Sequence, residues 1–144
     1  TTSDGRLLLN FYSQGFEEPF YAQQMSDGTL KLFTYLLLLE DPEPYSLICI
    51  EEPENGLYHK LLSMLACEFR EYALRSNNKS QVFITTHQPY LVNALDPDEV
   101  WILEKQADGF STISRASNNE LVKNLADEGV ELGSLWNSDY LDDN

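Results

Sequence analysis

The sequence predicts an α/β fold in which a mainly parallel sheet is flanked by helices. Two short apolar runs, Leu47–Ile50 and Gln81–Thr86, have the length and composition of buried strands. Between them, apolar residues recur every fourth position from Leu57 to Ala73, which is typical of a helix with one buried stripe. Because strand–helix–strand units of this length favour parallel pairing, we expect the two strands to be neighbours.

The remaining elements follow from local patterns. Leu30–Glu40 is apolar nearly all round, as expected for a helix buried on several sides. A strand is predicted over Arg6–Ser13, and a hairpin around Asp108-Gly109 is predicted to join Val100–Glu104 to Phe110–Arg115. A helix is predicted over Asn118–Glu128. The tail is predicted to dock through Leu132, Leu135 and Trp136. We expect a single domain over residues 1–144, with residues 129–144 as its C-terminal tail.

The composition is that of a globular and strongly acidic chain. Nine basic residues against 24 acidic ones give a net charge of −15. Because nucleic-acid affinity depends on neutralising phosphates, direct contact with DNA would need another part of the protein or a local basic patch. We expect a nucleic acid or effector protein, where there is one, to bind through other regions. No apolar stretch is long enough to cross a membrane and no signal peptide is visible, so we expect a cytoplasmic protein. Cys49 and Cys67 lie in apolar patterns and are predicted to be small core residues.

The candidate site begins where the first predicted strand ends in two acids, Glu51 and Glu52. In open α/β sheets the ligand crevice lies at the carboxyl end of the strands. Pro53, Asn55 and Gly56 then supply turn chemistry before the helix. This order is how a nucleotide hydrolase presents a magnesium-binding and a water-orienting carboxylate. The alternative is a solvated acidic start to the following helix.

Two further stretches carry polar groups at the ends of elements. Ser26 or Asp27 can cap the helix that follows, which would place free N–H groups and a hydroxyl together as an anion site or simply form an ordinary N-cap. His87 ends the second predicted strand. It can face the same crevice as the two glutamates, or it can be structural.

In order, the stretches MSDGT, LICIEEPENGL and ITTHQPYLV resemble the C-terminal half of an ABC-type ATPase head. The nearest likeness is to the AAA-family ATPases allied to DNA-repair, chromosome-maintenance and phage-defence ATPases. The resemblance covers about residues 20–105 and implies the C-terminal lobe of a P-loop NTPase with a mainly parallel sheet.

The resemblance also implies cofactors, a partner and residue roles. It implies ATP and Mg²⁺ as cofactors and a homodimer joined through ATP. Glu51 takes the magnesium position, Glu52 polarises the attacking water and His87 senses the γ-phosphate. The signature motif, which contacts ATP held by the opposite subunit, corresponds here to Ser26, Asp27, Gly28 and Thr29. The D-loop, which lies at the subunit interface, corresponds to Asn55, Gly56 and Leu57.

No P-loop of the form GxxxxGK[ST] occurs in the 144 residues. We therefore expect the P-loop lobe to be encoded upstream, this chain alone to be inert, and the full protein to hydrolyse ATP as a head-to-tail dimer. Two alternatives stay open. One is a metal-dependent hydrolase that uses Glu51, Glu52, Glu54 and His87 as ligands. The other is a non-enzymatic acidic interaction domain on a nucleotide-hydrolase fold.

Overall fold

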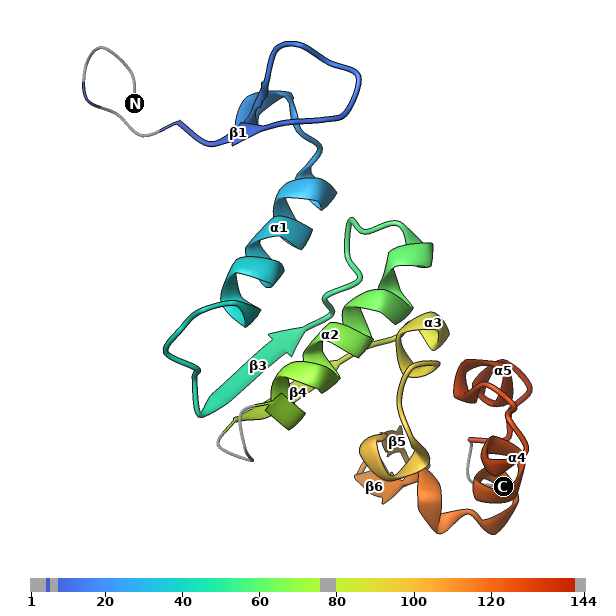
Figure 1. Cartoon of the computed structure of the whole chain (residues 1–144). Coiled ribbons are helices and arrows are strands. Elements are labelled where there is room, and N and C mark those ends of the chain that lie inside the picture. Colours follow the sequence, from blue (N-terminus) through green and yellow to red (C-terminus); the bar gives the residue numbers. More distant parts are fainter. Residues whose placement is uncertain (1–4, 6–7, 76–79, 142–144) are drawn as a thin grey trace. The chain divides into compact units, whose positions relative to one another are not determined.

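A computed structural model describes residue 5 and residues 8–75 and 80–141 (Figure 1). The chain divides into two compact units, Thr1–Pro42 and Glu43–Asn144, and each is described by itself. In the first unit, β1 (Asn10–Phe11) pairs antiparallel with β2 (Phe20–Tyr21). A 3₁₀ turn and α1 (Asp27–Leu39) follow. The strand predicted over Arg6–Ser13 is thus much shorter, and its first two residues lie outside the described part.

Helix α1 begins earlier than predicted because Ser26 caps it. The Ser26 hydroxyl accepts a hydrogen bond from the backbone N–H of Thr29 at 3.1 Å. The prediction that this helix is buried on several sides is wrong, since Leu39 is its one buried residue. Leu37, for example, is 57% exposed. An apolar helix needs cover on every side to be buried, and the described residues of this chain cover only part of α1.

In the second unit, β3 (Leu47–Glu51) and β4 (Gln81–Thr85) form a parallel pair, in register from Leu47 opposite Gln81 to Glu51 opposite Thr85. A 3₁₀ turn (His59–Leu61) and α2 (Leu62–Arg75) connect them. The α/β class and the parallel pairing of these two strands are confirmed. The other two strand pairs of the described chain are antiparallel.

Helix α2 packs on one face of this pair, where Ile84 of β4 contacts the cluster of Leu62, Ala66 and Leu91 (Figure 1). The buried residues of α2 are Leu62, Leu65, Ala66, Phe69 and Tyr72. Their spacing of three and four follows the 3.6-residue turn of the helix, so the stripe includes more residues than the predicted four-residue repeat. The Tyr72 hydroxyl also accepts the N–H of Tyr45 at 3.0 Å, which ties the helix to the segment before β3.

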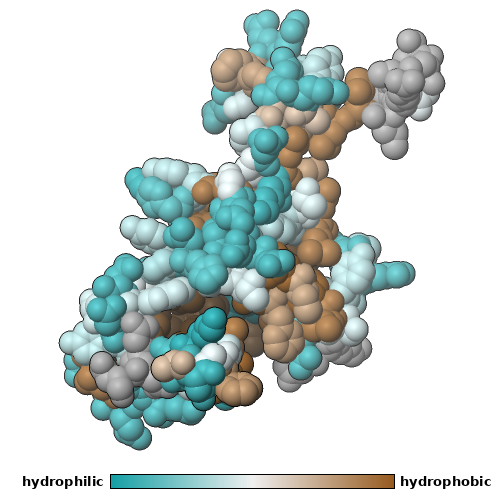
Figure 2. Space-filling view, turned by 180° about the vertical axis from the view of Figure 1, so that it is seen from behind, coloured by the Kyte–Doolittle hydropathy of each residue, from teal (hydrophilic) through white to brown (hydrophobic). Residues whose placement is uncertain are grey.

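Both strands were predicted to be buried, and this is wrong for one of their faces. Ile48 is buried at 6% exposure, whereas Leu47 and Phe83 are more than half exposed. Alternate strand residues point to opposite faces, and α2 covers only one of them. Cys49 of β3 and Cys67 of α2 are exposed, so the prediction that they are core residues is also wrong. Apolar atoms accordingly reach the surface in several places (Figure 2).

The rest of the second unit forms its own core. It comprises α3 (Pro89–Val92), β5 (Trp101–Lys105), β6 (Ser111–Arg115), α4 (Glu120–Asp127) and α5 (Leu132–Asn137), with 3₁₀ turns at Pro97–Glu99 and Ala116–Asn118. The predicted hairpin is confirmed, because β5 and β6 pair antiparallel. The predicted docking of the tail is confirmed too, since Leu132 and Leu135 are buried against Val92, Ala116 and Val122. None of the described helices is long and apolar enough to span a bilayer.

Arg70 links α2 to the 3₁₀ turn before β5. Its guanidinium donates to Asp96 and, through Nε at 2.9 Å, to Glu99. The hydrogen bond to Glu99 is the main cause that raises the pKa of Arg70 above its ordinary value. As far as the charge of Arg70 is concerned, its ion pairs therefore stabilise the fold fully below the ordinary pKa of arginine. Raising the pH removes this stabilisation only as it passes through the higher pKa of the folded protein, in strongly alkaline solution.

We therefore expect Arg70→Met to lower the free energy of unfolding by about 0.5–1 kcal/mol, since these groups are partly exposed and screened by water. Urea titrations of the variant and of Lys123→Met, which lies on another helix, would measure this. The difference from the parent should be the same between pH 6 and pH 9 and should shrink in 1 M salt. A loss that disappears at pH 9 would contradict this account.

Candidate functional site

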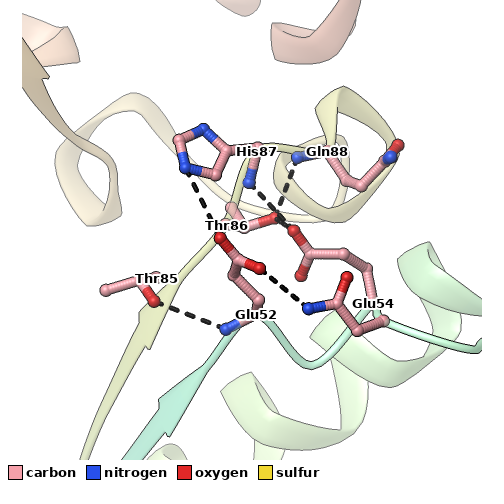
Figure 3. Close-up of polar contacts among 7 residues, drawn as sticks. Glu52, Glu54, Thr85, Thr86, His87 and Gln88 are labelled. Atoms are coloured by element: carbon pink, nitrogen blue, oxygen red, sulfur yellow. Dashed lines mark hydrogen bonds and ion pairs between the residues drawn. The ribbon is translucent and has the colours of Figure 1, made fainter.

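The carboxyl end of β3 carries the acid pair into a turn beside the end of β4 (Figure 3). Glu51 is the last residue of β3 and lies opposite Thr85. The N–H of Glu52 still donates to the carbonyl oxygen of Thr85 at 2.9 Å, so the next residue remains attached to β4. Glu52 itself has φ of 43°, in the left-handed region that side chains other than glycine rarely adopt. Strain of this kind, which costs about 1–3 kcal/mol, is concentrated at functional sites.

The side chain of Glu52 contacts both His87 and Asn55, which the sequence indicated as separate parts of the site. Its Oε1 atom lies 3.6 Å from Nε2 of His87, and its Oε2 atom accepts a hydrogen bond from Nδ2 of Asn55 at 2.8 Å (Figure 3). The His87 side chain is 85% exposed and that of Glu52 is 37% exposed. The site is thus open to solvent and offers a carboxylate oxygen facing an imidazole. The prediction that His87 can face the crevice beside Glu52 agrees with this geometry.

Glu54, which the sequence indicated only as a ligand in the metal-hydrolase alternative, contacts the segment that follows β4. Its Oε1 atom accepts hydrogen bonds from the Thr86 hydroxyl at 2.7 Å and from the His87 N–H at 2.9 Å (Figure 3). It is only 8% exposed. In the sequence it stands between Pro53 and Asn55-Gly56, where turn residues predict an exposed acid, so its burial had no local signal.

The turn after Glu52 is tight. The N–H of Asn55 donates to the carbonyl oxygen of Glu52 at 3.2 Å, and the N–H of Leu57 donates to that of Glu54 at 2.9 Å. Gly56 has φ of 80°, which a residue with a side chain would adopt only under strain. Asn55 and Gly56 are exposed and Leu57 is half-buried. The three residues that the resemblance assigns to the D-loop therefore belong to one compact turn, and Asn55 in this turn donates to the Glu52 carboxylate.

The signature-type residues lie in the first unit, at the start of α1. Ser26, Asp27 and Thr29 are exposed, and Gly28 is half-buried. The hydroxyls of Ser26 and Thr29 lie 2.8 Å apart and share a hydrogen bond. Ser26 therefore acts as an N-cap, as predicted. Glu51, Glu52 and His87 belong to the second unit.

The donor atoms at this site fit a magnesium ion that is shared with a bound phosphate. Mg²⁺ usually takes one or two carboxylates together with water and substrate oxygens, and Glu51 and Glu52 offer such carboxylates. In the described part of the chain, no group of three or more His, Cys, Asp or Glu side chains is arranged to hold a metal by itself. The metal-hydrolase alternative therefore lacks its ligand set among these residues.

Comparisons with known proteins agree with this fold. A family model described as "AAA domain, putative AbiEii toxin, Type IV TA system" matches residues 4–93, more than half of the chain. A solved structure from "Structural biochemistry of ATP-driven dimerization and DNA stimulated activation of SMC ATPases" is similar, with a TM-score of 0.54 and 16% identity over 88% of this chain and 75% of the other. No curated protein matches. The matched segment contains every site residue named above, and the chain belongs to this AAA-domain family, with the fold of an ABC/AAA-type ATPase head.

Proposed function

We propose that this chain supplies four parts of a magnesium-dependent ATPase that works as a homodimer with composite sites. They are the Walker B strand Leu47–Glu51, the D-loop Asn55–Leu57, the switch histidine His87 and the signature residues Ser26–Thr29. The observation that carries the proposal is the meeting of Glu52 and His87 at the carboxyl end of a parallel strand pair, 3.6 Å apart. Residues 1–144 act as one C-terminal lobe, with residues 129–144 as its tail, and the P-loop comes from polypeptide outside them.

Glu52 is the group that orients and polarises the attacking water. Its Oε1 atom lies 3.6 Å from Nε2 of the exposed His87 side chain, while the Asn55 amide donates to Oε2. Oε2 is thus held in place, and Oε1 is available to accept a hydrogen bond from the attacking water. His87 lies where it can donate to a phosphate oxygen or to Glu52. Phosphoryl transfer needs this kind of positioning more than covalent chemistry.

Glu51 is the residue that holds the metal. It ends β3, is exposed, and lies next to Glu52 in the chain. When bound there, Mg²⁺ neutralises phosphate charge. Ser26, Gly28 and Thr29, at the start of α1, contact the nucleotide of the opposite subunit through N–H groups and hydroxyls. The turn of Asn55, Gly56 and Leu57 lies at the same subunit interface.

The assembly we propose works in a DNA-repair or defence-type system of the cytoplasm. The family description names a toxin system, and the neighbour's description names ATPases that DNA activates, which supports the defence-type or DNA-linked part of this role. With a net charge of −15, this chain leaves contacts with DNA, RNA or an effector to other regions.

The test is ATP hydrolysis by the natural assembly that contains both this chain and its P-loop. We expect turnover to fall to background when Mg²⁺ is removed with excess EDTA and to return when Mg²⁺ is restored. Turnover that is unchanged in EDTA would remove Glu51 from its metal-binding role. A purified assembly without any ATP turnover would favour the non-enzymatic alternative.

The signature role of Ser26 can be separated from its role as a helix cap. Ser26→Asp keeps a capping oxygen but places negative charge where a phosphate should bind, so we expect the ATP-driven dimer to be lost. Ser26→Ala removes the cap and should cost about 1 kcal/mol of stability. Light scattering with a non-hydrolysable ATP analogue would measure the dimer. A Ser26→Asp protein that still dimerises like the parent would contradict the assignment.

A further inference from the structure

Among the described residues, one charged side chain is buried, that of Glu54. It lies beside Glu52 and His87, the pair proposed to act in catalysis, and bonds the backbone of His87. Glu54 is 8% exposed. A single oxygen of its carboxylate, Oε1, accepts two hydrogen bonds, one from the Thr86 hydroxyl and one from the N–H of His87 (Figure 3). Both donors belong to the segment that follows β4, whereas Glu54 belongs to the turn that follows β3. The carboxylate therefore connects the ends of the two strands through side-chain contacts.

This arrangement is a poor one for stability alone. The second oxygen, Oε2, is buried and accepts no hydrogen bond from the described residues. Buried polar atoms are nearly always paired, because an unpaired one loses its bonds to water without replacement. A smaller or apolar side chain in the turn would avoid that cost. The retained carboxylate points to a role in the site.

His87 needs such an anchor because its own ring is barely held. The side chain is 85% exposed, so packing does not fix its direction. Its distance of 3.6 Å from Glu52 is longer than an ordinary hydrogen bond. The direction of the ring therefore depends on the backbone that carries it, and Glu54 binds that backbone at the N–H of His87.

The anchor extends to the residues on either side of His87. Thr86 donates its hydroxyl proton to Glu54 and accepts the N–H of Gln88 at 3.0 Å. One carboxylate thus fixes three consecutive residues, directly or through one hydroxyl, just before α3 begins at Pro89. Hydrogen bonds to an ionised acceptor are about twice as strong as neutral ones, so the carboxylate charge matters as well as its position.

We propose that Glu54 is a positioning residue that holds His87 in reach of Glu52 by fixing the segment 86–88. This rests on the ATPase function proposed above. Because Glu54 is buried and acts through the backbone of His87, its loss should lower kcat while leaving the KM for ATP nearly unchanged.

Substitutions at Thr86 test this without disturbing the packing. Thr86→Val keeps the shape but removes the hydroxyl, and Thr86→Ser keeps the hydroxyl but removes the methyl group. We expect Thr86→Val and Glu54→Gln each to lower kcat about tenfold, with KM for ATP within about twofold of the parent. Thr86→Ser should keep kcat within about twofold. The control Glu71→Gln, an exposed charge change on α2, should have no effect.

A second measurement on the chain itself does not depend on nucleotide. Amide hydrogen exchange, followed by NMR, should become about fivefold faster or more at His87 in Glu54→Gln, while the amides of α2 keep their rates. Parental exchange at His87 in Glu54→Gln would overturn the proposal, and so would parental kcat in both Glu54→Gln and Thr86→Val. An assembly that turns over no ATP would overturn the proposed function, and with it the effect on kcat, whereas unchanged exchange at His87 would overturn the anchor alone.

Discussion

Replacing Glu52 by glutamine is expected to lower the kcat for ATP hydrolysis about 100-fold or more, with ATP binding retained. The amide keeps the shape of the side chain and can still meet Asn55, but it cannot take up a proton from water or carry negative charge. General-base groups typically contribute factors of about 10²–10⁴ to the rate. The loss should therefore appear in kcat and leave the KM for ATP almost unchanged.

Steady-state turnover and nucleotide binding, measured on the same P-loop-containing assembly, separate these effects. Glu71→Gln provides the matched control, because it makes the same chemical change at an exposed site on α2. The variant should also collect in the ATP-bound dimer, since binding persists without hydrolysis. Parental turnover in Glu52→Gln would show that the water is activated elsewhere.

The second large effect is on folding, at Gly133. This residue is buried in α5, where it lies directly against α3. A Cβ atom placed on it would lie 2.7 Å from the carbonyl carbon of Pro89 and would collide with the Pro89 carbonyl oxygen and with Oδ1 of Asn93. Two backbones approach each other here because one of them has no side chain.

We expect Gly133→Ala to lower the free energy of unfolding by about 1–3 kcal/mol, the usual cost of overpacking a core. The change would also weaken the hydrogen bond from the N–H of Gly133 to Asn93, which is 2.7 Å long. Ser134→Ala, at the next and exposed position of the same helix, should change stability by less than about 0.5 kcal/mol. Urea denaturation of the three proteins would measure the difference. Equal midpoints for Gly133→Ala and the parent would contradict the packing described for α3 and α5.

The elements that could be predicted are those whose signals are local. The hairpin of β5 and β6 follows from Asp108-Gly109 between strand-like runs, and the parallel pairing of β3 with β4 follows from the helix between them. The proximity of Glu52 and His87 then follows, because Glu52 comes directly after β3 and His87 comes two residues after the end of β4. In each case, neighbouring residues in the sequence carried the information.

The features that could not be predicted depend on which surfaces meet. Cys49 and Leu47 have the apolar surroundings of a buried strand, yet they are exposed on the face of the pair opposite α2. Glu54 has the surroundings of an exposed turn, yet it is buried by contacts with residues more than thirty positions later. Neither outcome has a sequence signal, because each depends on what lies opposite the residue in space.

The parallel pair has a further consequence for handling the isolated chain. Parallel strands are normally covered on both faces, and unpaired backbone groups along a strand can add another strand. Among the described strands, β3 and β4 each pair on one side only. With Leu47 and Phe83 exposed beside these open edges, the isolated chain should tend to aggregate as its concentration rises. Light scattering should therefore increase with concentration for this chain alone and fall when a polypeptide that completes the sheet is added.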